Sequence, residues 1–169
     1  MKTFVILGMH RSATSLLAKG LDEVGVYMGD ELLGPDNHNI YGHYEDIDFL
    51  KLNIKILEGA GGSWDNPPEE EAILSLRREF GNKIESLVRK KEREPFWGWK
   101  DPRTTLTVRL FHPYLRNPIY YAAFRDPWEV GISLKTRNPQ FNREEAMKLG
   151  KIYNERLLSF LNDITRNAS

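Results

Sequence analysis

The chain contains no cysteine. That absence excludes disulfide frameworks, thiolate nucleophiles, cysteine-ligated zinc and iron–sulfur clusters, and it fits a reducing compartment such as the cytoplasm. The chain also lacks an excess of either charge, since 24 Lys and Arg face 24 Asp and Glu and the formal net charge is +0. A broad basic field for nucleic acid is therefore absent, and we expect any bound anion to be held by a local group of side chains.

Long hydrophobic runs and internal repeats are missing as well. The first apolar run, Phe4–Leu7, is far too short for a membrane span or for the core of a signal peptide. With 169 residues, 40% of them hydrophobic, the chain can bury one core. We therefore expect a single soluble domain over residues 1–169 in the cytoplasm, with no membrane partner and no nucleic-acid partner.

Three short segments have the pattern of buried strands. Residues 3–7 are rich in β-branched and aromatic side chains, continuous rather than alternating, and end at Gly8. Residues 96–99 and 119–124 are similarly apolar and aromatic, and residues 26–28 are a candidate fourth strand.

Helical periodicity fills the segments between these strands. Helices are predicted at about residues 17–24, 47–57, 69–93, 103–115 and 143–165, and from an Asp126 cap followed by Pro127. Strands separated by helices imply parallel pairing and right-handed crossovers. The sequence therefore predicts an α/β fold of three layers, α/β/α, around a small central parallel sheet.

The first strand is joined to the first helix by residues 8–15, which are Gly8, Met9, His10, Arg11, Ser12, Ala13, Thr14 and Ser15. At such a turn, free backbone N–H groups and the positive end of the helix dipole converge and form an anion site. Hydroxyl groups add neutral donors, and Arg11 adds a forked cation suited to phosphate or sulfonate oxygens. The competing interpretation is a tight strand–helix connection with a capping serine.

The nucleoside-triphosphate form of this turn has the pattern G-x-x-x-x-G-K-[ST]. Here Ala13 and Thr14 occupy the sixth and seventh positions, so the lysine that reaches the β and γ phosphates is missing. A nucleotide without a γ phosphate, and without a bridging Mg²⁺, needs no such lysine. The loop therefore favours a 5′-phosphate ligand over ATP.

Two further basic residues follow the other strands. Lys100 comes after the second strand, and Arg125 comes after the third, with Ser133 eight residues later in the next helix. Because parallel strands end at one rim of a sheet, we expect Arg125, Lys100 and residues 8–15 to line one crevice. The alternative is that Arg125 is only structural or faces solvent.

Together these residues resemble the sulfotransferases that use 3′-phosphoadenosine 5′-phosphosulfate, in particular the bacterial and carbohydrate-acting branch. Residues 8–15 are similar to that family's 5′-phosphosulfate loop, usually written with R-S-G-T, and Phe124–Pro127 with Ser133–Leu134 resembles its 3′-phosphate motif. Trp99–Arg103 matches a further element common in the bacterial branch, so the resemblance spans Thr3 to about Asn138.

The resemblance implies a P-loop NTPase-like topology and a donor site without a required metal. In that site Gly8, His10, Arg11, Ser12, Ala13, Thr14 and Ser15 hold the 5′-phosphosulfate, and Arg125 and Ser133 hold the 3′-phosphate. Ala13 departs from the family, which has glycine there. If this position needs a positive φ, alanine costs roughly 1 kcal/mol, whereas in a helical conformation it costs nothing.

The reaction implied is sulfuryl transfer to a hydroxyl of a carbohydrate or small metabolite. Negative charge then grows on the oxygen that bridges phosphorus and sulfur, and we expect Arg11, Lys100 and the loop N–H groups to stabilise it. Glu45 is the candidate base because its position resembles an acidic residue of bacterial relatives. His43 is the competing base, and a helix-start glutamate favoured by the helix dipole is the structural alternative for Glu45.

Two other functions stay open on the sequence alone. A P-loop-type phosphotransferase (kinase) would need Mg²⁺ ligands, for which Asp101 is the only strand-end acid. A non-catalytic nucleotide-binding protein would keep the loop but lose turnover through Ala13. No metal site is predicted, because the histidines and acids of residues 38–46 are too loosely spaced for a metal cluster. The sequence defines neither the acceptor nor the oligomeric state.

Overall fold

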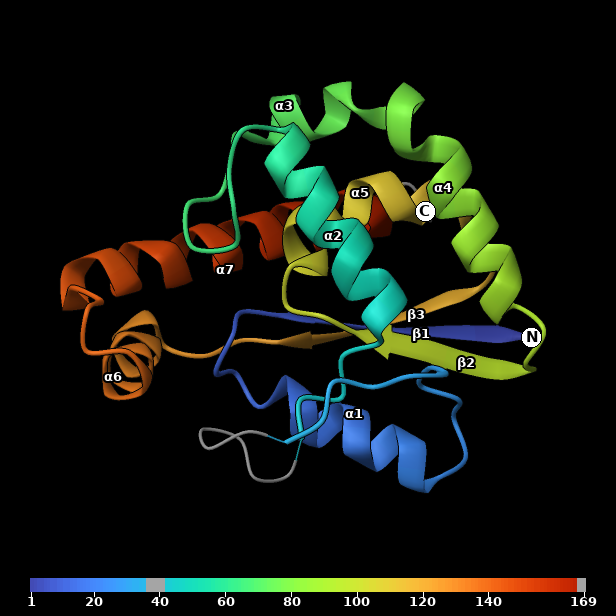
Figure 1. Cartoon of the computed structure of the whole chain (residues 1–169), viewed down its shortest axis with the longest axis horizontal. Coiled ribbons are helices and arrows are strands. Elements are labelled where there is room, and N and C mark those ends of the chain that lie inside the picture. Colours follow the sequence, from blue (N-terminus) through green and yellow to red (C-terminus); the bar gives the residue numbers. More distant parts are fainter. Residues whose placement is uncertain (36–41, 167–169) are drawn as a thin grey trace.

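A small parallel sheet forms the centre of the computed structural model, which describes residues 1–35 and 42–166 (Figure 1). Strand β1 runs over Lys2–Gly8, β2 over Phe96–Lys100 and β3 over Pro118–Ala123. The strand order is β2-β1-β3, and both outer strands are parallel to β1. All three therefore end at the same rim of the sheet, as the sequence predicts.

Seven α-helices accompany this sheet in the part of the chain that the structure describes. Their bounds are α1 Thr14–Glu23, α2 Ile47–Gly59, α3 Glu70–Ser75, α4 Arg77–Lys91, α5 Thr104–Phe111, α6 Pro127–Arg137 and α7 Arg143–Arg166. The predicted α/β class is confirmed. None of the helices in residues 1–35 and 42–166 is long and apolar enough to cross a membrane.

Two predicted helices differ in detail. The helix expected after Pro68 is two helices, because the chain bends at Leu76 and both α3 and α4 then pack against α5. The helix expected to reach Leu115 ends at Phe111 and continues as a short 3₁₀ turn. Pro113 lies in that turn, and its missing N–H prevents a further α-helical bond.

The candidate fourth strand at residues 26–28 does not form. Tyr27 alone pairs with β2, in an isolated parallel bridge to Trp97. The chain turns on either side of it at Gly25 and Gly29, whose φ angles of 90° and 139° lie outside the strand region. In the described residues the sheet therefore has three strands.

Side chains of β1 alternate between two cores, one on each face of the sheet. Val5 and Leu7 belong to a large cluster that includes α2, α4, α5 and α7, whereas Ile6 packs with Ala18 of α1 on the other face. Figure 1 shows α1 on one side of the sheet and α2 and α5 on the opposite side. Burial on both faces explains why the apolar run of β1 is continuous.

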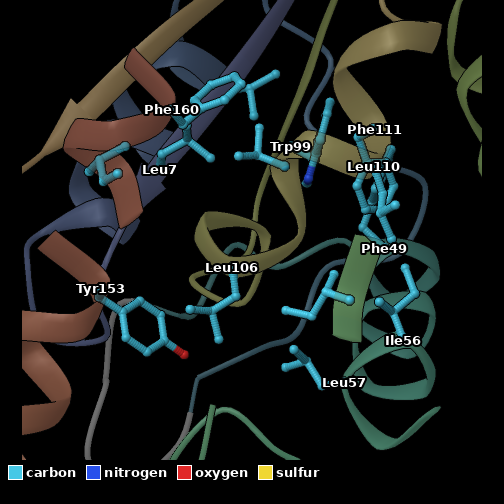
Figure 2. Close-up of a cluster of buried hydrophobic side chains, with 14 of the residues drawn as sticks. Leu7, Phe49, Ile56, Leu57, Trp99, Leu106, Leu110, Phe111, Tyr153 and Phe160 are labelled. Atoms are coloured by element: carbon cyan, nitrogen blue, oxygen red, sulfur yellow. The ribbon is translucent and has the colours of Figure 1, made fainter. Parts of the chain in front are cut away.

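Stacked aromatic rings fill the larger core (Figure 2). Phe49 of α2 lies with its ring centroid 4.3 Å from that of Trp99, and Trp97 and Trp99 are fully buried. The helical periodicity of residues 47–57 predicts Ile54 on the buried face, but Ile54 is 37% exposed and Phe49 faces the core instead. Aromatic side chains of β2 and α2 therefore form part of the larger core, on one face of the sheet.

Candidate functional site

The turn between β1 and α1 contains residues with unusual backbone conformations. Gly8, Arg11 and Ala13 have φ angles of 152°, 68° and 60°. A Cβ on Gly8 would lie 2.7 Å from the carbonyl oxygen of Ala123, so only glycine allows the end of β1 to approach β3 this closely. Thr14 is the first residue of α1 and Ala13 is its N-cap, so the interpretation as a serine-capped helix is wrong.

Ala13 has the left-handed conformation, with φ 60° and ψ 17°. Of the two possibilities that the sequence leaves open, the strained one is therefore found. A residue with a Cβ costs roughly 1 kcal/mol more than glycine in this conformation. The alanine thus lowers the stability of the turn while the chain keeps a conformation that glycine would also adopt.

Arg11 connects the loop to α6. Its Nε donates a hydrogen bond to Ser133 Oγ at 2.9 Å, and its backbone carbonyl accepts one from Arg125 Nη1 at 2.6 Å. Arg125 also contacts the carboxylate of Glu129 at 3.2 Å, and its own carbonyl accepts a bond from Asn154. The three residues Arg11, Arg125 and Ser133, far apart in the sequence, therefore form one cluster at the rim of the sheet.

Asp126 and Pro127 start α6 as their sequence predicts. The Asp126 carboxylate accepts the backbone N–H of Trp128 at 2.8 Å, and Pro127 is the first helical residue. This cap sets the direction of α6. Ser133, two turns further on, thereby faces Arg11.

A cavity of about 270 Å³, here called the loop cavity, lies beside residues 8–15. Its lining includes four cationic side chains, Arg11, Lys100, Arg125 and Arg137, and one carboxylate, Glu45. In a chain with no net charge, this is the local concentration of positive charge that an anion requires.

Two further cavities adjoin it. The α6 cavity, of about 380 Å³, has Arg11, Arg125, Ser133 and Arg137 in its wall. The Leu33 cavity, of about 240 Å³, lies on the side of the segment that contains Leu33. Arg137 lines all three cavities, so they adjoin one another at this side chain.

Glu45 is almost fully buried at the border of the loop and Leu33 cavities. Its carboxylate accepts a bond from Lys100 Nζ at 2.8 Å and contacts Arg103 Nη1 at 3.4 Å. Lys100 also donates to the carbonyl of His43 at 2.9 Å. The predicted base and the predicted cation are therefore an ion pair, and His43 lies directly beside them.

Glu45 does not lie in the first turn of a helix. The helix begins at Ile47, and the carboxylate of Asp46 caps it by accepting the N–H of Asp48 at 2.8 Å. Glu45 precedes this cap, and its carbonyl accepts the N–H of Leu33 at 2.8 Å. The carboxylate of Glu45 is held by Lys100 and Arg103 rather than by the backbone N–H groups of this helix.

A buried polar network supports Arg103. Asp101 is fully buried and accepts bonds from Arg103 Nη1 at 2.9 Å and from Asn53 Nδ2 at 2.8 Å. Asn53 also accepts the hydroxyl of Thr107 at 2.6 Å. Burial raises the pKa of Asp101, an effect that the charge of Arg103 opposes. The network fixes Arg103 against Glu45.

His10 lines both the loop cavity and the Leu33 cavity. Its ring packs on Trp64, with centroids 4.5 Å apart, and its Nε2 is buried without a hydrogen-bond partner. Burial lowers the pKa of His10 well below 6.5, and the charges of Arg103, Lys100 and Arg137 lower it further. The imidazole is therefore neutral at neutral pH.

The hydroxyl residues of the loop have different surroundings. Ser12 is 5% exposed and its Oγ is buried without a partner, whereas Ser15 Oγ donates to the carbonyl of His43 at 3.1 Å. Thr14 is buried and lines the loop cavity. Among the described residues, the hydroxyl groups of Ser12 and Thr14 therefore form no hydrogen bond to an element outside the loop.

No group of three or more histidine, aspartate or glutamate side chains in residues 1–35 and 42–166 is arranged to hold a metal ion. His38, which the sequence places near His43, lies outside the described residues. Asp46 faces Lys91, at 2.7 Å, rather than the cavities.

Three residues of this site are not found by the sequence analysis. Arg103 is visible only as part of a motif, Arg137 is one of several basic residues at a helix end, and Asn53 is a polar residue inside an apolar pattern. Of the three, only Asn53 could have been noticed from the sequence, because a buried asparagine must have hydrogen-bond partners.

Comparison of the chain with models of protein families, with curated proteins and with solved structures finds no match.

Proposed function

We propose that the chain is a sulfotransferase that moves a sulfuryl group from 3′-phosphoadenosine 5′-phosphosulfate to a hydroxyl of a carbohydrate or small metabolite. One observation carries the proposal: Arg125 contacts the carbonyl of Arg11 at 2.6 Å, and Arg11 contacts Ser133 at 2.9 Å. A nucleoside with anionic groups on both sides of its ribose needs two anion-binding elements within reach of one molecule. Residues 8–15 and the start of α6 are two such elements.

In this proposal residues 8–15 hold the 5′-phosphosulfate. Backbone N–H groups and the positive end of α1 supply a preformed anion site, and Arg11 adds a guanidinium group. Arg125 and Ser133 hold the 3′-phosphate, since both line the α6 cavity beside Arg11. The finer fold that accompanies the proposal is P-loop NTPase-like, with the anion loop after the central strand of the order β2-β1-β3.

The reaction follows from these positions. The acceptor oxygen attacks sulfur, the bond between sulfur and the phosphate oxygen breaks, and its electron pair stays on that oxygen. Arg11, Lys100 and the loop N–H groups stabilise the charge that develops there. The acceptor proton passes to Glu45, with His43 as the competing base, and later to solvent. The products are adenosine 3′,5′-bisphosphate and a sulfate ester.

The contact of Lys100 with Glu45, at 2.8 Å, has a consequence for this mechanism. Before reaction the ammonium group is neutralised by the carboxylate. When Glu45 takes the proton, its charge disappears at the same time as charge grows on the leaving phosphate. Lys100 then interacts more strongly with the transition state than with the ground state, which is the condition for catalysis.

A phosphotransferase is disfavoured by the surroundings of Asp101. Both of its carboxylate oxygens already accept hydrogen bonds, one from Asn53 and one from Arg103, and the side chain is fully buried. A Mg²⁺ ion needs accessible carboxylate oxygens. Together with the missing loop lysine, this removes the only strand-end acid that a kinase would use.

Binding and turnover measured on the full chain test the proposal. Calorimetric titration should give an affinity for adenosine 3′,5′-bisphosphate about tenfold or more above that for 5′-AMP, because the second phosphate gains charge-assisted hydrogen bonds. Transfer of label from the sulfonate donor to a panel of hydroxyl compounds then tests catalysis. Tighter binding of ATP with Mg²⁺ would contradict the proposal, and binding without any transfer would favour the non-catalytic alternative.

A matched pair of variants locates the 3′-phosphate. Arg125→Ala should weaken adenosine 3′,5′-bisphosphate far more than 5′-AMP, whereas Arg78→Ala, an exposed arginine of α4, should change neither affinity. Equal losses of both nucleotides in Arg125→Ala would refute its proposed role.

A further inference from the structure

The Leu33 cavity lies next to the loop cavity and shares part of its wall. His10, His43, Glu45 and Arg137 line both, so a molecule in one cavity faces a molecule in the other across the same side chains. Its volume of about 240 Å³ is slightly below the usual range of ligand pockets, which suits a single ring or a smaller molecule.

Two buried polar atoms of this cavity lack partners in the described residues. Arg103 uses its Nη1 for both Asp101 and Glu45, but its Nε has no hydrogen-bond acceptor. The Nε2 of His10 is also buried and unpartnered. Buried polar atoms without partners are costly, so the wall of this cavity contains two polar side chains whose hydrogen bonding is incomplete.

Several side chains that line the Leu33 cavity are charged. Its wall contains two guanidinium groups, Arg103 and Arg137, and one carboxylate, Glu45, which Lys100 contacts at 2.8 Å. Asp101 lies 2.9 Å from Arg103 and offsets part of its charge. Positive charge from Arg103, Lys100 and Arg137 is also one cause of the lowered pKa of His10. The electrostatic potential at this point therefore favours an anion. Leu33, together with its neighbours Gly34 and Pro35, supplies the less polar side of the wall.

From this juxtaposition we infer that the Leu33 cavity is the acceptor subsite, and that it takes a hydroxyl compound which also carries a carboxylate. Arg103 and Arg137 bind the carboxylate, and the hydroxyl lies toward His43 and Glu45 at the border with the loop cavity. The inference rests on the proposed sulfotransferase function, since that function makes the Leu33 cavity an acceptor site. It adds the chemical class of the acceptor, which neither the loop nor α6 defines.

Pairs of compounds that differ only in the carboxylate test this inference. Glucuronate with glucose represents sugars, and glycerate with glycerol represents small hydroxy acids. Each compound is titrated into the full chain saturated with adenosine 3′,5′-bisphosphate, and into the chain alone. The acidic member of at least one pair should bind about tenfold more tightly than its neutral partner, because charge-assisted hydrogen bonds form only with the acid. Which pair shows the preference distinguishes sugar acids from small hydroxy acids.

Arg137→Gln is the informative variant, since Arg103 also supports the buried network. It should reduce the ratio of acidic to neutral affinity about tenfold, and Lys135→Gln, an exposed residue of the same helix that lines none of the three cavities, should leave the ratio unchanged. Equal binding of acid and neutral partner in both pairs, or an unchanged ratio in Arg137→Gln, would overturn the inference. Failure to bind adenosine 3′,5′-bisphosphate would instead count against the proposed function, because the ratio is also measured without it.

Discussion

Arg11 Nε donates a hydrogen bond to Ser133 Oγ at 2.9 Å, although 122 positions separate the two residues in the sequence. The bond joins the turn after β1 to the second turn of α6. It orients the guanidinium group of Arg11 along the rim of the sheet, between the loop and α6 cavities that it lines.

Replacing Ser133 by alanine tests this relationship. Ser133→Ala removes the bond to Arg11 and a donor for the proposed 3′-phosphate, and hydrogen bonds to charged groups are worth about 1.5–3 kcal/mol. We therefore expect the affinity for adenosine 3′,5′-bisphosphate to fall about tenfold or more by calorimetry, with a smaller loss for 5′-AMP. Ser86→Ala, at an exposed position of α4, is the control and should bind both as the wild type does.

Ala13→Gly should stabilise the protein. Ala13 has a φ of 60°, and glycine removes the roughly 1 kcal/mol that a Cβ costs in this conformation. Urea denaturation should show a free energy of unfolding higher by about 1 kcal/mol. Ala18→Gly, in the middle of α1, should have the opposite sign because glycine destabilises a helix interior. A lower stability for Ala13→Gly would show that the turn relaxes in solution.

Asn53→Leu should destabilise the fold strongly. The amide of Asn53 binds Asp101 at 2.8 Å and Thr107 at 2.6 Å, and the substitution removes both bonds and leaves one buried oxygen of Asp101 without a donor. Buried unsatisfied groups cost about 1–3 kcal/mol each, so we expect a loss of about 3 kcal/mol in the free energy of unfolding. Asn82→Leu, at an exposed position of α4, should change the stability by less than about 0.5 kcal/mol. Similar small effects at both positions would contradict the network.

Stability should fall as the pH drops below the ordinary pKa of histidine. The folded state holds the pKa of His10 well below 6.5. At pH values between this lowered pKa and 6.5, the unfolded chain therefore binds a proton that the folded chain does not. The free energy of unfolding then decreases toward acid, by at most about 1.4 kcal/mol per pH unit for this one group.

Two histidine variants separate the contributions to that slope. His10→Gln should remove the share of His10, measured as the difference in slope between wild type and variant from urea denaturation at pH 5.5–7. His112, whose pKa burial also lowers, contributes with the same sign and is examined separately through His112→Gln. An unchanged slope in His10→Gln would mean that His10 has the same pKa in the folded and unfolded states, which would contradict the lowered pKa.

Local sequence patterns correctly predict an element where its own residues determine its position along the chain. The continuous apolar run at residues 3–7 predicts β1, and Asp126 with Pro127 predicts the start of α6. The pattern fails where packing between elements decides: Ile54 has a core-like spacing but faces outward, because Phe49 stacks on Trp99. Likewise Tyr27 belongs to a strand-like segment yet forms only one bridge.

The candidate site shows the same division. The loop after β1, Lys100, Arg125 and Ser133 are predicted from strand ends, and the structure brings all of them to one rim. The pairing of Lys100 with Glu45 at 2.8 Å is not predictable, because the segment before α2 is positioned by its backbone contact with Leu33.

The sequence by itself determined the alternation of strands and helices, the neutral overall charge and the identity of the residues in the anion loop. These follow from side-chain periodicity, from residue counts and from the backbone preferences of glycine and proline, which act over a few neighbouring residues. Only the tertiary structure decided that Ala13 takes a left-handed conformation, that Glu45 pairs with Lys100, and that Arg11 meets Ser133. Such contacts join residues far apart along the chain, and their geometry exists only once the sheet and its helices have packed.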